Sequence, residues 1–126
     1  MEKRARENFR TLLNLYPYSY AITVHYARNL LLSGQSSLAY SLLQDYRRNR
    51  DSDILILDLL AKAASNTGKT AEAYLYLAEH DFLNGDTRTA ISHLKTAASI
   101  KGIDYYLSSQ IDAKLKEYKQ IALLEK

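Results

Sequence analysis

The feature that most constrains the fold of this chain is the spacing of its four glycines. Gly34, Gly68, Gly85 and Gly102 are separated by 34, 17 and 17 residues, and each follows a segment with apolar residues at helical spacing. Glycine adopts a positive φ without steric cost, so it is common just beyond the end of a helix. The spacing therefore predicts helices of similar length, separated by short turns that recur along the chain.

The rest of the sequence also favours helices. The chain has 126 residues with one proline, four glycines and no cysteine, and helix-forming residues such as alanine, leucine, lysine and glutamate are common. Short turns force neighbouring helices to pack antiparallel. We expect a single all-α domain over residues 1–126, with seven helices near 2–15, 18–33, 36–49, 52–67, 70–84, 87–100 and 103–124.

Alanines recur where two helices of a hairpin must approach closely. About 34 residues is the length of a tetratricopeptide repeat (TPR), which is one helix–turn–helix unit. With Gly34, Gly68 and Gly85 at the fifteenth position of that pattern, alanine occupies every small position, the eighth and the twentieth. Small residues there let the ridges of the two helices interlock. The six alanines are Ala27, Ala39, Ala61, Ala73, Ala78 and Ala90.

This register resembles the tetratricopeptide pattern and implies its architecture. We expect a TPR-like, right-handed solenoid of antiparallel helix hairpins, in which the helix near 70–84 serves two successive hairpins. Extended backwards, the register places Ala5, Phe9 and Leu12 at second-helix positions of a preceding repeat, and Pro17 at its terminal proline. Because that repeat has no first helix here, either a dedicated capping helix starts the solenoid or the chain is excised from a longer protein, and we expect excision.

The end of the chain carries a more specific resemblance. The segments concerned are 104–106 (Asp-Tyr-Tyr), 109–117 (Ser-Gln-Ile-Asp-Ala-Lys-Leu-Lys-Glu), 71–73 (Ala-Glu-Ala) and 77–79 (Leu-Ala-Glu). In this order they resemble the C-terminal tetratricopeptide domain of BepA/YfgC-like bacterial zinc metallopeptidases. Gln110 and Lys114 depart from that pattern, because the family has arginine at both positions.

The resemblance implies a function for the chain. In that family the domain is attached to a periplasmic His-Glu-x-x-His peptidase that acts in outer-membrane protein assembly and quality control. The expected role is a non-catalytic protein–protein interaction domain that recruits substrate or assembly components and positions or regulates the peptidase. Zinc would belong only to the peptidase domain. The alternative is a free-standing TPR adaptor with no link to a peptidase.

The residues themselves offer no catalytic motif. A helix-borne zinc site needs two histidines one turn apart, with a glutamate beside the first, and His25, His80 and His93 lack this spacing. No phosphate-binding or nucleophile motif is present either. We therefore predict that the chain is not an enzyme and binds no cofactor or metal. His80 is predicted to be a structural histidine with a satisfied hydrogen bond, and His93 a surface residue.

A partner site can be predicted from the resemblance. Repeat positions two, five, nine and twelve of the first helices line the concave face in tetratricopeptide domains. Such domains can grip a carboxylate with lysine and asparagine, but Val24, Asp58 and Leu75 break that pattern. A peptide, an extended strand or the parent's own peptidase domain could fit. The predicted concave face comprises Val24, Arg28, Leu31, Asp58, Lys62, Ser65, Leu75, Glu79 and Phe82, with Arg28 and Lys62 as anion contacts and Phe82 as an apolar anchor.

Charge and aromatic content exclude other partners. The 17 basic and 14 acidic residues are largely interleaved, which is typical of solvated helix faces, and no stacking pattern accompanies Arg47, Arg48 and Arg50. We therefore expect no binding to nucleic acid. No apolar run is long enough to insert in a membrane. Most of the eleven tyrosines are expected to pack in the core or along hairpin seams.

Overall fold

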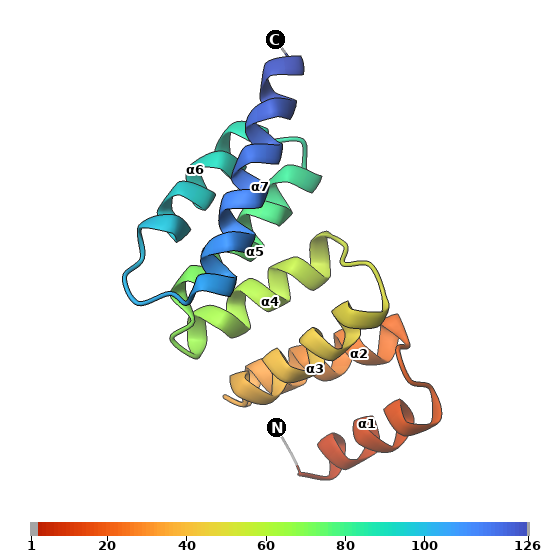
Figure 1. The fold of residues 1–126 in the computed structure, drawn as a ribbon. Helices are drawn as coiled ribbons and strands as arrows, with labels where there is room; N and C mark the ends of the chain where they lie inside the picture. Colours follow the sequence, from red (N-terminus) through yellow and green to blue (C-terminus); the bar gives the residue numbers. More distant parts are fainter. Residues whose placement is uncertain (1–2, 126) are drawn as a thin grey trace.

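The computed structural model describes residues 3–125, and every regular element in them is an α-helix (Figure 1). The predicted all-α fold is confirmed, and each helix begins and ends within two residues of its predicted bounds. The seven helices are α1 (Lys3–Leu15), α2 (Tyr20–Leu32), α3 (Ser36–Asn49), α4 (Ile54–Asn66), α5 (Thr70–Leu83), α6 (Thr87–Ser99) and α7 (Tyr105–Leu124).

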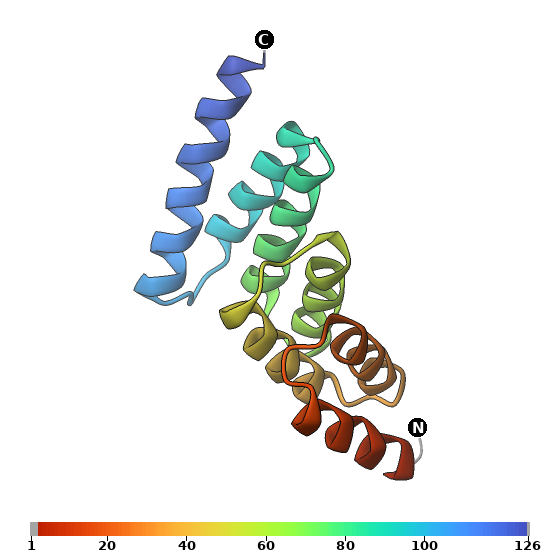
Figure 2. The same cartoon turned by 90° about the vertical axis from the view of Figure 1, so that its right-hand side faces the viewer.

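The helices follow one another through space in the order of the sequence. Each helix packs mainly against the next one in the chain, as an antiparallel hairpin, and α2 also contacts α4. The two ends of the chain consequently lie at opposite ends of the molecule (Figures 1 and 2). Within residues 3–125, no helix combines the length and the apolar character that crossing a membrane requires.

Three of the predicted glycine turns have the same geometry. After α2, the amide of Gly34 donates to the carbonyl of Leu31, and the amide of Gln35 donates to the carbonyl of Leu30. The same pair of bonds ends α4 at Gly68 and α5 at Gly85, and all four glycines have φ between 77° and 83°. This arrangement satisfies carbonyls that the end of a helix leaves free. The repeated glycine therefore makes a repeated hairpin.

Side chains cap the first turns of four helices. The hydroxyl of Ser19 accepts the amide of Ile22, and the carboxylates of Asp53, Asp86 and Asp104 each accept an amide three residues later. Such caps satisfy amides that have no partner within the helix. Asp53 also accepts a hydrogen bond of 2.6 Å from the hydroxyl of Tyr20, which fastens the start of α4 to α2.

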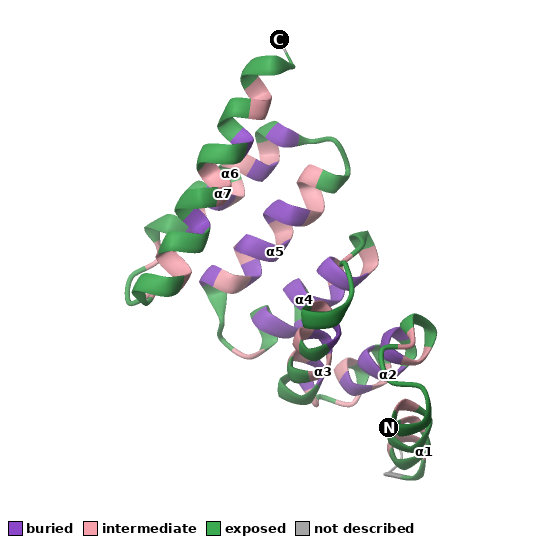
Figure 3. Cartoon of the chain, turned by 45° about the vertical axis from the view of Figure 1, so that its right-hand side comes forward, coloured by how far each residue is buried: buried purple, intermediate pink, exposed green. Residues whose placement is uncertain are grey.

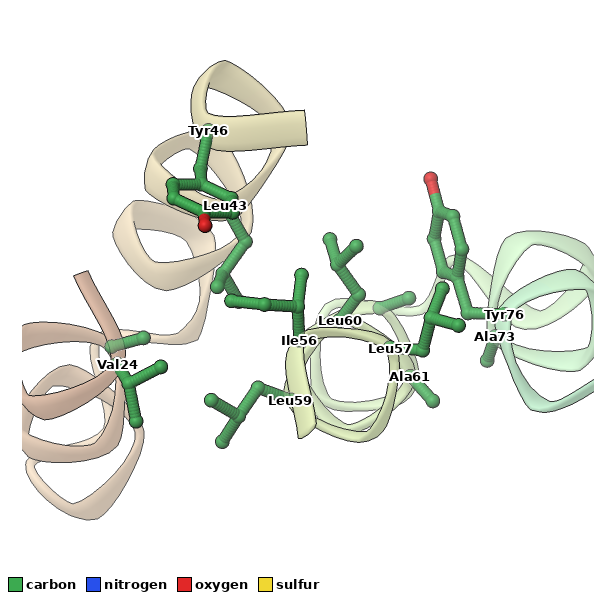
Figure 4. Packing of buried hydrophobic residues seen from close by; sticks show 12 residues of the cluster. Val24, Leu43, Tyr46, Ile56, Leu57, Leu59, Leu60, Ala61, Ala73 and Tyr76 are labelled. Atoms are coloured by element: carbon green, nitrogen blue, oxygen red, sulfur yellow. The ribbon is translucent and has the colours of Figure 1, made fainter. Parts of the chain in front are cut away.

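The N-terminal core is centred on α4, which has seven buried residues, more than any other helix. Its side chains point to both sides in Figure 4: Leu59 lies toward Val24 of α2, and Leu57 lies toward Tyr76 of α5. Leu43 and Tyr46 of α3 complete this core. By contrast, α1 has no buried residue among those described (Figure 3). It packs against α2 through a stacked Phe9–Tyr26 pair.

All six alanines of the predicted register are buried, at 7 % exposure or less. They allow α2–α3, α4–α5 and α5–α6 to approach closely, as the register predicts. Helix α5 serves both neighbours: Ala73 and Tyr76 belong to the N-terminal core, and Leu75 and Ala78 to a C-terminal core with α6 and α7. Ile111 and Tyr118 of α7 are buried in that second core.

Candidate functional site

The nine residues predicted to line a concave face do not form one surface. Val24 and Leu75 are buried in the N-terminal and C-terminal cores, so their side chains present almost no surface to a partner. Arg28 is exposed on α2, and Leu31 packs half-buried against the N-terminal core. The remaining five residues divide between two separate regions.

Three of the predicted residues meet between α4 and α5. Asp58, Lys62 and Ser65 line a cavity of about 370 Å³ together with Tyr74 and Leu77 of α5. The ammonium of Lys62 lies 3.1 Å from a carboxylate oxygen of Asp58, one turn earlier on the same helix. Lys62 therefore has an anionic partner in its own helix, with which a ligand anion would compete.

Glu79 and Phe82 lie instead beside α7. Glu79 is 7 % exposed, although its position was predicted to face a partner. The ring of Phe82 stacks on that of Tyr118, with centroids 4.1 Å apart and planes within 5°. Because α7 covers this side of α5, the two residues belong to a groove between three helices, which we call the α3–α5–α7 groove.

The groove consists of two adjoining cavities that share Arg47, Glu79 and Lys114. The first has a volume of about 450 Å³ and lies between the end of α3, the end of α5 and the middle of α7. The second has a volume of about 550 Å³ and extends toward the start of α7. The shared residues stand where the two cavities meet, so their chemistry determines what each cavity can hold.

These three residues form an ion-pair cluster, which we call the Glu79 triad. Oxygen Oε1 of Glu79 accepts from Arg47 Nη2 at 2.8 Å and lies 3.2 Å from Lys114 Nζ. Glu79 is held on α5, Arg47 on α3 and Lys114 on α7. Two cations and one carboxylate leave the triad with a net charge of +1. A partly buried cluster that is not neutral has a large residual field, because water screens it poorly.

Several polar atoms around the first cavity have no hydrogen-bond partner among the described residues. Arg47 Nη1, Glu79 Oε2 and Ser52 Oγ are buried and unpartnered, and all three residues line this cavity. Burial lowers the pKa of Arg47, but the hydrogen bond and the charge of Glu79 outweigh burial and raise it, so the guanidinium stays charged. Two donors and one acceptor beside the cavity are therefore unsatisfied, although none of the three atoms is exposed to solvent.

A hydrogen-bonded cluster forms the wall of the second cavity. Gln44 Nε2 donates to the hydroxyl of Tyr40 at 2.9 Å and to the hydroxyl of Tyr76, and the two hydroxyls lie 3.2 Å apart. Because both Nε2 hydrogens are used and one hydroxyl donates to the other, one hydroxyl hydrogen and the Gln44 carbonyl remain for a ligand. Tyr106 of α7, 72 % exposed, lines the opposite side.

Sequence reasoning missed most of the groove, although the repeat length contains a signal for it. Arg47 and Glu79 are 32 residues apart, as are Gln44 and Tyr76, and Tyr40 and Tyr76 are 36 apart. These separations are close to one repeat, so equivalent faces of successive hairpins carry side chains that meet. Pairing polar residues one repeat apart would have found this cluster.

Neither of the two histidine predictions is confirmed. His93 was predicted to be a surface residue, which is wrong: it is half-buried, and its Nδ1 lies 2.5 Å from the carboxylate of Asp81. His80 was predicted to have a satisfied hydrogen bond. Its Nδ1 lies 3.8 Å from Asp81, which is beyond hydrogen-bond distance, and no hydrogen bond joins it to the described residues.

Comparison with known proteins identifies no relative of this chain. No protein-family model matches the chain, and no curated protein shows a significant match. Among residues 3–125, no group of three or more histidine, cysteine, aspartate or glutamate side chains is arranged to hold a metal ion. The family resemblance therefore stays a prediction based on the residues quoted for it.

Proposed function

We propose that this chain is a protein-interaction domain that binds an extended segment of a partner protein in the α3–α5–α7 groove. The observation that carries the proposal is the groove itself: two adjoining cavities lined by polar side chains of three helices and by tyrosines, of which Tyr106 is exposed. Tyrosine supplies large contact area at a small entropic cost and is enriched at binding hot spots. An extended backbone would use the free donors and acceptors.

The proposal extends the tetratricopeptide resemblance but moves the binding surface. Three residues of the predicted face, Leu75, Glu79 and Phe82 of α5, line this groove, whereas its other walls come mainly from α3 and α7. Its partner could be a substrate, an assembly component or the peptidase domain of the same protein, as the resemblance to BepA/YfgC-like metallopeptidases implies. The finer proposal is that the domain recruits or positions substrates for a periplasmic zinc peptidase acting in outer-membrane protein assembly.

The binding test uses a matched pair of tyrosines on α7. Tyr106 lines the groove, whereas its neighbour Tyr105 is 87 % exposed and does not. The purified chain is applied to an array of 15-residue peptides that tile outer-membrane β-strands and soluble proteins, and Kd is measured for the peptides it retains. Tyr106→Ala should weaken binding about fivefold or more, the loss of about 1 kcal/mol that marks a contributing contact.

Tyr105→Ala is the control and should bind like the unchanged chain. If both variants bind equally well, or if no peptide is retained, the groove is not the binding site. The peptidase context is tested separately. The reading frame that encodes the chain should also encode a His-Glu-x-x-His segment upstream, and a frame without one would favour the free-standing adaptor.

A further inference from the structure

We infer that the first cavity of the α3–α5–α7 groove binds a carboxylate of the partner segment, next to an apolar side chain. This inference rests on the proposed function and adds the chemistry of the ligand. The receiving groups are Arg47 and Lys114, helped by the hydroxyl of Ser52, and the apolar wall is the stacked pair of Phe82 and Tyr118.

The charge of the Glu79 triad points to an anion. Arg47 and Lys114 share one oxygen of a single carboxylate, so one positive charge is not neutralised. Their side chains are only 30 % and 33 % exposed, so water stabilises this charge less than it would at an open surface. A second carboxylate would make the cluster neutral.

The unpartnered atoms beside the cavity add to the case for a polar ligand. Arg47 Nη1 and Ser52 Oγ are buried donors, and a change of side-chain rotamer would bring them to a carboxylate in the cavity, where the bond from the guanidinium would be charge-assisted. Glu79 is more than nine-tenths buried, with 8 % of its side chain exposed, and its unpaired Oε2 would accept an amide N–H only after the same rearrangement. A peptide segment with an acidic group carries both the anion and the N–H donor that these atoms would bind.

Other charges at this cavity lie on its rim. Arg50 adds a positive charge, while Asp51 and Glu117 add two negative ones, and all three are exposed. Water and salt screen exposed charges strongly, so they contribute less than the half-buried triad. Among the described residues, no ion pair connects Asp51 or Glu117 with Arg47 or Lys114.

The apolar wall gives the ligand its second feature. Tyr118 is 3 % exposed and Phe82 is half-buried, while Leu83 beside them is 51 % exposed at the mouth of the cavity. An aliphatic side chain next to the ligand carboxylate would cover Leu83 and the edge of the ring stack. Burial of that surface would add to the affinity that the charge provides.

The test is an NMR titration of the ¹⁵N-labelled chain with small probes of matched shape. N-acetyl-aspartyl-leucinamide carries a side-chain carboxylate, and N-acetyl-asparaginyl-leucinamide is its neutral counterpart. N-acetyl-leucine carries a terminal carboxylate instead. The aspartyl probe should shift amides near Arg47, Ser52 and Lys114 and bind about fivefold more tightly than the asparaginyl probe, which corresponds to about 1 kcal/mol for one partly exposed ion pair.

Variants then identify the groups that hold the anion. Lys114→Gln should remove most of the preference for the aspartyl probe over the asparaginyl probe. Ser52→Ala should weaken binding of the aspartyl probe without changing any charge. Lys116→Gln is the matched control, because Lys116 is exposed on the same helix and does not line the cavity. Glu79→Gln should strengthen binding of the aspartyl probe, since the triad then carries two uncompensated cations. Salt at about 0.5 M should weaken the aspartyl probe selectively.

The outcomes separate this inference from the proposed function. Equal binding of the aspartyl and asparaginyl probes in the groove overturns the carboxylate inference and leaves peptide binding intact. Equal effects of Lys114→Gln and Lys116→Gln also overturn it, as does absence of binding by both acidic probes. Failure of the peptide array overturns the proposed function itself. Comparison of the two acidic probes shows whether a terminal or a side-chain carboxylate is preferred.

Discussion

At the scale of single residues, the groove depends on ionisable groups that the fold holds away from water. Tyr118 packs beneath the Glu79 triad, with its ring against Phe82 and the ammonium of Lys114 5.8 Å from its centroid. Burial raises the pKa of the Tyr118 hydroxyl, and the negative charge of Glu79 raises it further. The phenol is therefore neutral in the folded protein under conditions where an exposed tyrosine ionises.

This difference predicts how stability changes in alkali. Below about pH 10 the folded and unfolded chains both keep the Tyr118 proton, so it contributes no pH dependence. Above that pH the unfolded chain ionises first, so stability falls. The free energy of unfolding should therefore decrease between pH 8 and pH 11, and Tyr118→Phe should remove about 1 kcal/mol of that decrease. Urea unfolding at both pH values measures it, with exposed Tyr105→Phe as the control. An equal loss in both variants would contradict a raised pKa at Tyr118.

At the scale of elements, the glycine turn determines how one helix follows another. Gly68 ends α4 with φ of 77°, and its amide and that of Lys69 bond back to α4. A side chain added at Gly68 would meet no atom within 4 Å. The glycine is therefore required by its backbone conformation, not by a lack of space around it.

Gly68→Ala should lower the free energy of unfolding by about 1–2 kcal/mol, which is the cost of a left-handed conformation in a residue with a β-carbon. Gly68→Asn should lose less, because asparagine adopts this conformation more readily. Thermal or urea unfolding of both variants measures the difference. A loss that is the same for alanine and asparagine would mean that something other than φ determines the effect.

At the scale of the whole molecule, the core is distributed along the array of helices. The N-terminal core draws on α2 to α5, and the C-terminal core on α5 to α7, with α5 contributing to both. Contacts run mainly between neighbouring helices. In arrays of this kind, stability is approximately a sum of local terms and of interfaces between neighbours.

We therefore expect core mutations to act locally. Leu94→Ala, in the C-terminal core, should lower the free energy of unfolding by about 2–5 kcal/mol. It should speed hydrogen exchange in α6 and α7 while leaving the amides of α2 and α3 protected. Leu57→Ala, in the N-terminal core, should have a similar cost but affect α3, α4 and α5. Hydrogen exchange resolved by segment compares the two. Uniform loss of protection in both variants would show a single cooperative unit instead.

The fold could be predicted because its determinants are local in sequence. Glycines, capping residues and small alanines each act within a turn or a hairpin, so the helices and the alanine contacts followed from the repeat. The groove could not be predicted in the same way. Glu79 was expected at an open face, and its burial depends on where α7 lies, which is determined by Ile111 and Tyr118 packing against α5 and α6.

Val24 and Leu75 also show that the position of a residue in the repeat does not determine whether it is exposed. Their repeat positions face a ligand in the tetratricopeptide pattern, yet here both are apolar and lie in the cores. The pattern identifies a helix face, but the angle at which neighbouring helices pack determines whether that face is open. Val24 instead packs in the core that α2 shares with α4. The groove instead occupies the side on which long polar side chains of α3, α5 and α7 meet.

The double membership of α5 has a mechanical consequence. Because one helix has side chains in both cores, no flexible joint separates the two ends of the molecule. Bending of the molecule must then occur as small shear movements between many pairs of packed helices. It cannot concentrate at one hinge. A pull on α7 would therefore be transmitted toward α2 through the successive interfaces between neighbouring helices.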